Sequence, residues 1–332
     1  NEIKRLLRER NLDPQTTRRI AVAAYELEIN ICIHSHGGTI GIVVTKDLLV
    51  EGVHFRAKDS RKSVAMKALR VNLSDIAAKG ARPLGYFLGC VWPQNVKEET
   101  IADFAAGLSE DQEAYKISLM GGDTTVHNQK GGLLIISVTM IGLRGSAGMI
   151  RRSGAKPGDD VYVSGTIGDA CLGLAVSKGE IKVAPAHKSF LTGRYLLPSP
   201  RVALGGALVG HASSAIDISD GLVADAGHVA AQSKVAIDLH AEKLPLSEAA
   251  KVWLDRQVPD EGYARLASGG DDYEILFTAP AARRRSIEMA SQVTKTPIAR
   301  IGSVAKGAGV SLLNAEGEKI GVGLTGYDHF GR

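Results

Sequence analysis

Five short segments of the chain place an aspartate beside glycine, serine or threonine, and most of them adjoin an apolar run that is typical of a β-strand. Carboxylates on tight turns suit hard divalent cations such as Mg²⁺, which prefer oxygen ligands. Mg²⁺ in turn suits a polyphosphate. The pattern therefore predicts an Mg-nucleotide enzyme whose site is assembled from distant loops. The segments are residues 45–47, 72–75, 121–125, 217–221 and 269–273.

The most informative segment is Asp217–Leu222, where an apolar strand gives way to a helix. Ser219 and Asp220 are good helix N-caps, so plain capping is the alternative interpretation. However, Asp217 and Asp220 lie three residues apart and would repel each other unless a cation lay between them. A helix N-terminus also favours phosphate. We therefore favour a metal site over a cap.

The other segments are individually weaker. Gly121–Thr125 follows an apolar run that predicts a strand over 116–120, and its glycines would let the backbone approach a ligand, although a hairpin-type turn is the alternative. Asn72–Asp75 falls inside a predicted helix, where serine and aspartate are mediocre formers. Arg152 either clamps phosphate or is a solvated linker charge, and both readings stay open. Neither a Walker A motif nor a kinase catalytic-loop signature is present.

Periodicity predicts the elements that must position these residues. We expect helices over 1–34, 62–79 and 98–114 and strands over 41–45, 84–92 and 132–143. Residues 144–158 are polar and rich in glycine, which marks a boundary. The later part alternates strands and helices. We therefore expect an α+β/α/β protein divided into a helical segment (1–41), an α+β ATP/Mg-binding domain with antiparallel strands (42–147) and an α/β domain (148–332).

Composition narrows the class of protein. The chain has 332 residues, of which 44% are apolar, and a formal charge of +4 with the basic residues spread along it. Nucleic-acid binding is therefore not expected. No stretch approaches the length of a transmembrane helix, no signal peptide is visible, and the three cysteines form no C-x-x-C pair. These features predict a cytoplasmic protein that does not bind membranes.

Taken in order, the motifs resemble the thiamine-monophosphate kinase family, which has a two-domain aminoimidazole ribonucleotide synthetase-like fold. The resemblance spans about residues 43–330. The segments that carry it are Leu49–Phe55, Val71–Ala78, Gly121–Thr125, Arg152–Ala155, Asp217–Leu222, Asp271–Glu274 and Gly326–Phe330.

The resemblance implies ATP-dependent phosphorylation of thiamine phosphate to thiamine diphosphate by a homodimer, with several Mg²⁺ ions and no catalytic residue beyond the metal cage. The implied metal ligands are Thr45, Asp47, Asp75, Asp123, Asp217 and Asp220. The implied nucleotide-binding residues are Tyr115, Gly122, Asp123, Arg152 and Ser219. The implied thiamine-phosphate residues are His54, Asp271 and Tyr327.

The start of the chain departs from this family. The usual Gly-Asp-Asp element is absent from residues 25–38, and Lys46 replaces a threonine beside Asp47. Residues 1–41 instead resemble the start of an anti-sigma-factor-type histidine-kinase-like ATPase. In that comparison Glu26, Asn30 and His34 share one face of a helix. An amphipathic helix with a solvent-exposed polar face explains the same spacing equally well. Two alternatives to the kinase follow: a weakened or regulatory binding protein, and a sister enzyme with another phosphate acceptor.

Overall fold

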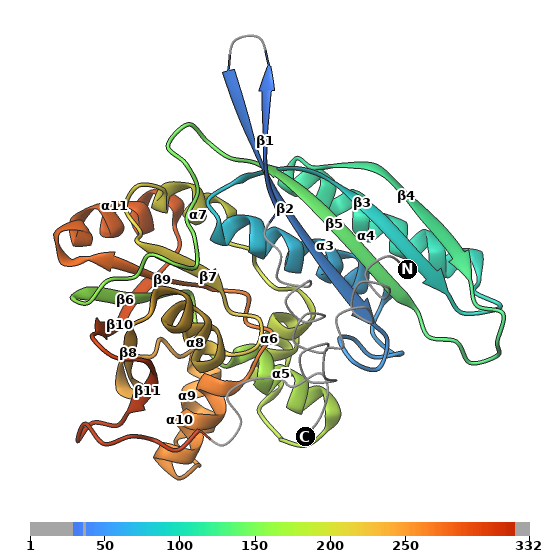
Figure 1. Ribbon diagram of the computed structural model, residues 1–332. Coiled ribbons are helices and arrows are strands. Elements are labelled where there is room, and N and C mark those ends of the chain that lie inside the picture. Colours follow the sequence, from blue (N-terminus) through green and yellow to red (C-terminus); the bar gives the residue numbers. More distant parts are fainter. Residues whose placement is uncertain (1–28, 36–37, 323–332) are drawn as a thin grey trace, which may run out of the picture.

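The computed structural model describes residues 29–35 and 38–322, with side chains from residue 41 onward. Two β-sheets, one from each half of the described chain, lie on either side of a central helix (Figure 1). Five strands that end before residue 144 form the first sheet, and six strands that begin after residue 158 form the second. The mixture of helices and sheets agrees with the expected α+β/α/β class.

The first sheet has the strand order β1-β2-β5-β3-β4. All neighbouring strands run antiparallel except β3 and β4, which are parallel. The β1–β2 hairpin projects beyond the rest of the molecule (Figure 1). The strands are β1 (Ile29–Ser35), β2 (Gly38–Val50), β3 (Arg82–Trp92), β4 (Ser118–Val126) and β5 (Ile135–Leu143).

Helix α3 (Arg61–Ala78) is the element shared by the two halves. It packs on β2 and β5 on one side, and on α7 (Val202–Leu208) and β7 (Ser214–Asp217) on the other. Because both sides are covered, most of its side chains are buried, including alanines that allow close packing. Ser60 caps its N-terminus by accepting a hydrogen bond from the backbone N–H of Ser63.

The second sheet has the order β11-β8-β10-β6-β9-β7, and only β8 and β11 form a parallel pair. Its remaining strands are β6 (Asp159–Ser164), β8 (Ala236–His240), β9 (Ile275–Pro280), β10 (Ile298–Ala305) and β11 (Gly309–Leu313). The other helices are α4 (Glu98–Tyr115), α5 (Asp169–Lys178), α6 (Pro185–Leu196), α8 (Leu222–Ser233), α9 (Glu248–Leu254), α10 (Pro259–Ser268) and α11 (Arg284–Thr294), with short 3₁₀ turns at Ala241–Lys243 and Ala281–Arg283.

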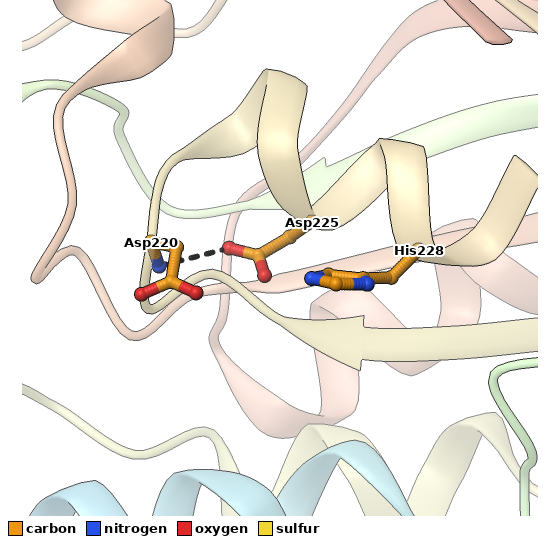
Figure 2. Close-up of side chains that lie close together, drawn as sticks. All are labelled: Asp220, Asp225 and His228. Carbon is orange, nitrogen blue, oxygen red and sulfur yellow. Dashed lines mark hydrogen bonds between the residues drawn. The ribbon is translucent and has the colours of Figure 1, made fainter. Parts of the chain in front are cut away.

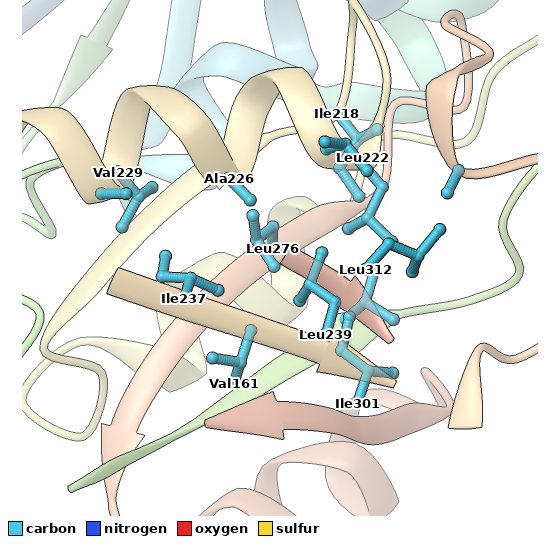
Figure 3. Close-up of a cluster of buried hydrophobic side chains, with 14 of the residues drawn as sticks. Val161, Ile218, Leu222, Ala226, Val229, Ile237, Leu239, Leu276, Ile301 and Leu312 are labelled. Carbon is cyan, nitrogen blue, oxygen red and sulfur yellow. The ribbon is translucent and has the colours of Figure 1, made fainter. Parts of the chain in front are cut away.

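Helix α8 covers one face of the second sheet and thereby fixes the loop that precedes it. Leu222, Ala226 and Val229 repeat at helical spacing and face the strands (Figure 3). They meet Ile237 and Leu276, and all five side chains are almost fully buried. This packing sets where the segment 217–221 enters the helix.

Most expected elements are confirmed, and two expectations are wrong. Residues 29–34 form strand β1 rather than a helix, because Ile29, Ile31 and Ile33 alternate with the period of a strand and pair with β2. Asn30 and His34 therefore do not share a helix face. The rest of this predicted helix, residues 1–28 with Glu26, lies outside the described residues.

The second error concerns Gly121–Thr125, which we expected in a turn after a strand over 116–120. These residues instead continue strand β4, because their backbone pairs in parallel with β3. A Cβ atom at Gly122 would lie 1.9 Å from the backbone oxygen of Leu88, so glycine is required there by close strand packing. Among the helices that the structure describes, none has the length and apolar character needed to span a membrane.

The contact between α7 and α3 gives a prediction about stability. A Cβ atom at Gly205 would lie 1.8 Å from the backbone oxygen of Ala77, whereas one at Gly206 meets nothing within 4 Å. We expect Gly205→Ala to reduce the free energy of unfolding by about 1–3 kcal/mol, because overpacking forces the backbones apart. Gly206→Ala is the matched control and should be neutral or slightly stabilising. Urea unfolding of both variants measures this, and equal effects would contradict the packing.

Candidate active site

Three aspartates from separate elements converge beside α3. Asp47 comes from β2, Asp75 from α3, and Asp217 from the end of β7, and the carboxylates of Asp75 and Asp217 lie close enough to Asp47 to raise its pKa. Asp220, in the loop that follows Asp217, also acts on Asp47. We call these four residues the acidic cluster. It draws on both sheets, although the chain separates its members by up to 173 residues, from position 47 to position 220.

The cluster carries more negative charge than its surroundings compensate. Burial and the neighbouring carboxylates of Asp75, Asp217 and Asp220 raise the pKa of Asp47 well above its usual value. Burial and Asp75 likewise raise the pKa of Asp217 to about 8. In addition, Oδ2 of Asp47 is buried without a hydrogen-bond partner among the described residues. Several carboxylate oxygens that repel one another and include an orphaned atom fit a hard cation such as Mg²⁺.

Some groups partly offset this charge. Ser74 donates a hydrogen bond to Asp217, and Arg152 and Lys79 lower the pKa of the same carboxyl electrostatically. Thr45 donates a short hydrogen bond from its hydroxyl to Asp75. Arg152 therefore lies near the cluster.

The loop before α8 is shaped by a carboxylate that the sequence analysis did not identify. Oδ2 of Asp225 accepts hydrogen bonds from the backbone N–H groups of Ser219, Asp220 and Gly221 at 3.0, 3.1 and 3.2 Å. Gly221 occupies the N-cap position with φ of 126°, and no side chain caps the helix. Capping by Ser219 or Asp220 is therefore ruled out.

Asp220, Asp225 and His228 offer a second set of metal-ligating groups. Their ligand atoms lie within 4.8 Å of one another, and Asp225 and His228 extend from successive turns of α8 toward Asp220 (Figure 2). One oxygen of Asp225 is already committed to three backbone N–H groups. Its main role is thus to hold the loop, and Asp220 is the member that the loop presents toward the acidic cluster.

His54 and Asp271 are joined by a buried lysine on α3. Lys67 donates from Nζ to Oδ2 of Asp271 at 3.1 Å and to the backbone oxygen of His54 at 3.2 Å. The Nδ1 atom of His54 accepts a hydrogen bond from the backbone N–H of Val50 at 3.0 Å, so any proton on the neutral ring is on Nε2. The two residues implied for thiamine phosphate are therefore neighbours.

Asp123 does not join the acidic cluster. The strand register aligns Leu48, Ser137, Gly89 and Asp123 in one row, whereas Asp47 belongs to the adjacent row. Adjacent rows point to opposite faces of a sheet. Asp123 is exposed on the outer face, away from α3. Lys46 is exposed on that outer face as well, so it does not crowd Asp47 as its position in the sequence suggested.

The remaining expected residues lie in separate elements of the chain. Ser219 lies in the Asp225-bound loop, and its backbone oxygen accepts from the N–H of Asp271 at 2.8 Å. Tyr115 ends α4 beside Arg70, whose guanidinium lies 5.9 Å from its ring centroid. Gly122 lies in β4 on the edge of the first sheet. Tyr327 lies outside the described residues.

Tyr273 is a further residue that the sequence analysis missed. Its backbone is left-handed, with φ of 50°, which is strained for a tyrosine. Burial and the charges of Asp271, Asp47, Asp217 and Asp220 raise the pKa of its hydroxyl, so this group lies near both the acidic cluster and Asp271. The sequence signal was its position beside Asp271 and Asp272 in the last aspartate segment.

The raised pKa values predict how stability depends on pH. The pKa of Asp217 in the folded protein, about 8, lies well above the usual range for an aspartate. A carboxyl whose pKa is higher in the folded state stabilises the fold while it is protonated. This contribution to the free energy of unfolding is complete below the pKa of the carboxyl in the unfolded chain, and it is lost as pH rises through about 8. We expect the thermal midpoint of the metal-free wild type to decrease as the pH is raised from 5 to 8.5. The decrease should be less steep in Asp217→Asn.

Thermal unfolding in a chelating buffer measures this difference, with the same series in Mg²⁺ as the comparison. Added Mg²⁺ should raise the midpoint most at high pH, where the carboxylates are ionised. Parallel pH profiles for the wild type and Asp217→Asn would contradict the assignment of this carboxyl.

Comparisons with known proteins agree with this architecture. The family model described as AIR synthase related protein, N-terminal domain, matches residues 29–144, a range that begins at β1. Thiamine-monophosphate kinase from Caulobacter vibrioides is 44% identical over 81% of this chain and 75% of the relative. The Escherichia coli K12 protein of the same name is 38% identical over 87% and 86%, respectively.

A solved structure, AaThiL complexed with AMPPCP and TMP, superposes with a TM-score of 0.80 at 30% identity, covering 97% of this chain and 98% of the other. The similarity thus extends through both sheets and the acidic cluster between them. The chain belongs to the thiamine-monophosphate kinase family.

Proposed function

We propose that this protein transfers the γ-phosphoryl group of ATP to thiamine phosphate and forms thiamine diphosphate. The observation that carries the proposal is the acidic cluster, whose carboxylates come from both halves of the chain. Its loop also contacts the Asp271 segment, because the backbone oxygen of Ser219 accepts a hydrogen bond from the N–H of Asp271. The relatives named thiamine-monophosphate kinase support the reaction. The AaThiL complex with AMPPCP and TMP supports a nucleotide and thiamine phosphate as the two ligands.

Mg²⁺ held by Asp47, Asp75, Asp217 and Asp220 would neutralise charge on the ATP phosphates during transfer. The protein's own side chains would hold the metal ligands in place. Thr45 orients Asp75 through its hydrogen bond, and Asp225 fixes the loop that presents Asp220. Arg152 provides a guanidinium at the same place for phosphate oxygens.

No side chain needs to act as a strong base in this reaction. The acceptor is a phosphate oxygen that is already ionised near neutral pH, so positioning and charge neutralisation carry the chemistry. His54 and Asp271 would hold the thiamine phosphate, with Tyr327 as a third expected contact. Tyr115 and Ser219 would contact the nucleotide. A cytoplasmic location, in keeping with the cysteine content, and the domain boundary near residue 147 form part of the same proposal.

We further infer that the protein is a homodimer joined through the outer face of the first sheet. Phe87 leaves large apolar surface exposed on the outer face of β3, and the adjacent edge strand β4 exposes Leu119, Met120 and Val126. Asp123 lies on the same exposed outer face as Phe87. A second copy packed on this face would bring Asp123 and Gly122 to a subunit interface, which is how Asp123 could serve a phosphate site although it is remote from Asp47.

Replacing Asp47 tests the proposed role of the acidic cluster. Asp47→Asn should lower kcat/KM for thiamine diphosphate formation by at least about 100-fold, because it removes a carboxylate from the cation site. Lys46→Thr, one residue away on the opposite sheet face, is the matched control and should have an effect at least ten times smaller. The assay is product formation from ATP, thiamine phosphate and Mg²⁺, with chelator added in parallel. A folded wild-type protein that binds both ligands without turnover would instead be a regulatory binding protein.

The dimer is tested by a charge placed on the outer sheet face. Phe87 is 44% exposed, whereas Val293 on α11 is 78% exposed and far from that sheet. We expect Phe87→Lys to convert a dimer into monomers and Val293→Lys to leave it intact, because only the former buries a charge in the contact. Light scattering coupled to gel filtration gives the masses. A monomeric wild type, or a dimer in both variants, would contradict the interface.

A further inference from the structure

Lys67 is a buried cation whose partners come from three separate parts of the chain. Its side chain is only 3% exposed, and its ammonium contacts Asp271 at 3.1 Å and the backbone oxygen of His54 at 3.2 Å. The ammonium also lies 4.0 Å from the ring centroid of Tyr195 on α6. The hydroxyl of Tyr195 donates to the same His54 oxygen at 3.4 Å. One ammonium thus joins α3, the loop after β2, the loop before β9 and α6.

The chemistry of an ammonium explains why all these contacts occur together. A buried ammonium is very costly unless a counter-charge and hydrogen-bond acceptors surround it. Here Asp271 supplies the charge, the His54 carbonyl supplies an acceptor, and the Tyr195 ring supplies a cation–π face. The side chain of Asp271 remains 28% exposed, so it stays accessible while one of its oxygens is held.

The position of Lys67 on α3 relates this contact to the metal cluster. Ser74 lies seven residues, or about two helical turns, further along the same face. Its hydroxyl has one proton and two acceptors beside it, the backbone oxygen of Tyr273 at 3.5 Å and the carboxylate of Asp217. Helix α3 therefore contacts the segment 271–273 at two points. Lys67 contacts the start of the segment, and Ser74 contacts its end. That segment is strained, since Asp271 has φ of 72° and Tyr273 has φ of 50°.

We propose that Lys67 is a positioning residue for the phosphate acceptor, acting by holding the Asp271 carboxylate and the His54 loop in a fixed relation across the two halves of the chain. This inference rests on the proposed function, in which Asp271 and His54 contact thiamine phosphate. Lys67 acts through these two residues, and the acidic cluster does not include it. Its loss should therefore impair the acceptor site more than the nucleotide site.

The first experiment compares Lys67→Met with the wild type by steady-state kinetics. We expect the KM for thiamine phosphate to rise about 10- to 100-fold, as for a lost hydrogen bond between charged groups, while the KM for ATP changes less than about threefold. Lys62→Met is the matched control, because Lys62 lies on the same helix and pairs with Glu110 at the surface. It should leave both constants unchanged.

A double-mutant cycle separates positioning from a general structural role. If Lys67 acts through Asp271, adding Lys67→Met to Asp271→Asn should raise the KM for thiamine phosphate by less than about threefold beyond Asp271→Asn alone. The double variant also removes both charges, so it avoids the unpaired buried ammonium or carboxylate that can unfold a single variant. Thermal unfolding of every variant confirms that folded proteins are being compared.

Three results would overturn the inference. The first two are an unchanged KM for thiamine phosphate in folded Lys67→Met, and a further tenfold rise in that KM when Lys67→Met is added to Asp271→Asn. Equal increases in both KM values would also overturn it, because they indicate a general structural defect. A folded wild type that forms no thiamine diphosphate would contradict the proposed function instead, and so the two failures are distinguishable.

Discussion

The mutual repulsion of buried carboxylates is the constraint on which the rest of this structure depends. Asp47, Asp75 and Asp217 come from two sheets and the helix between them, and burial together with neighbouring charge raises the pKa of Asp47 and Asp217. Such an arrangement opposes folding unless protons or cations are bound there. This unfavourable free energy arises where the two halves of the chain meet. A charged ligand can therefore contribute to holding the halves together.

Helix α3 makes this arrangement possible because it is packed on both sides. Its last turns carry Ser74 and Asp75 into the acidic cluster, and its first half carries Lys67 to the Asp271 segment. Phosphate donor and acceptor would thus be aligned along a single rigid element rather than by independent loops. Loops supply the remaining groups, and each is tied to a regular element, as Asp225 ties residues 219–221 to α8.

Local patterns predicted much of the fold, since α3, α4 and α8 and most strands lie within a few residues of where periodicity indicates them. Strand β1 was missed although its isoleucines alternate, because the apolar and polar residues of 20–34 also fit a helix. The aspartate segments identified the acidic cluster, but not the direction of each side chain. Asp123 faces away from Asp47 because of strand register, which depends on pairing between distant segments.

Lys67 and Asp225 could not be assigned roles from the sequence for a related reason. Lys67 meets Asp271 across 204 residues, and a lysine in an amphipathic helix is usually solvated. Asp225 lies in the first turns of α8, where an acidic residue ordinarily needs no special explanation. Only the folded structure shows that one oxygen of Asp225 accepts hydrogen bonds from three backbone N–H groups.

The central claim is that these carboxylates form one site for cations and phosphate, and proton release upon ligand binding tests it most directly. Calorimetric titration of Mg²⁺ with a non-hydrolysable ATP analogue near pH 7, in buffers of different ionisation enthalpy, measures this release. We expect net proton release for the wild type, because bound cations displace protons from Asp47 and Asp217, and a smaller release for Asp217→Asn. Binding without proton release, or equal release from both proteins, would contradict it.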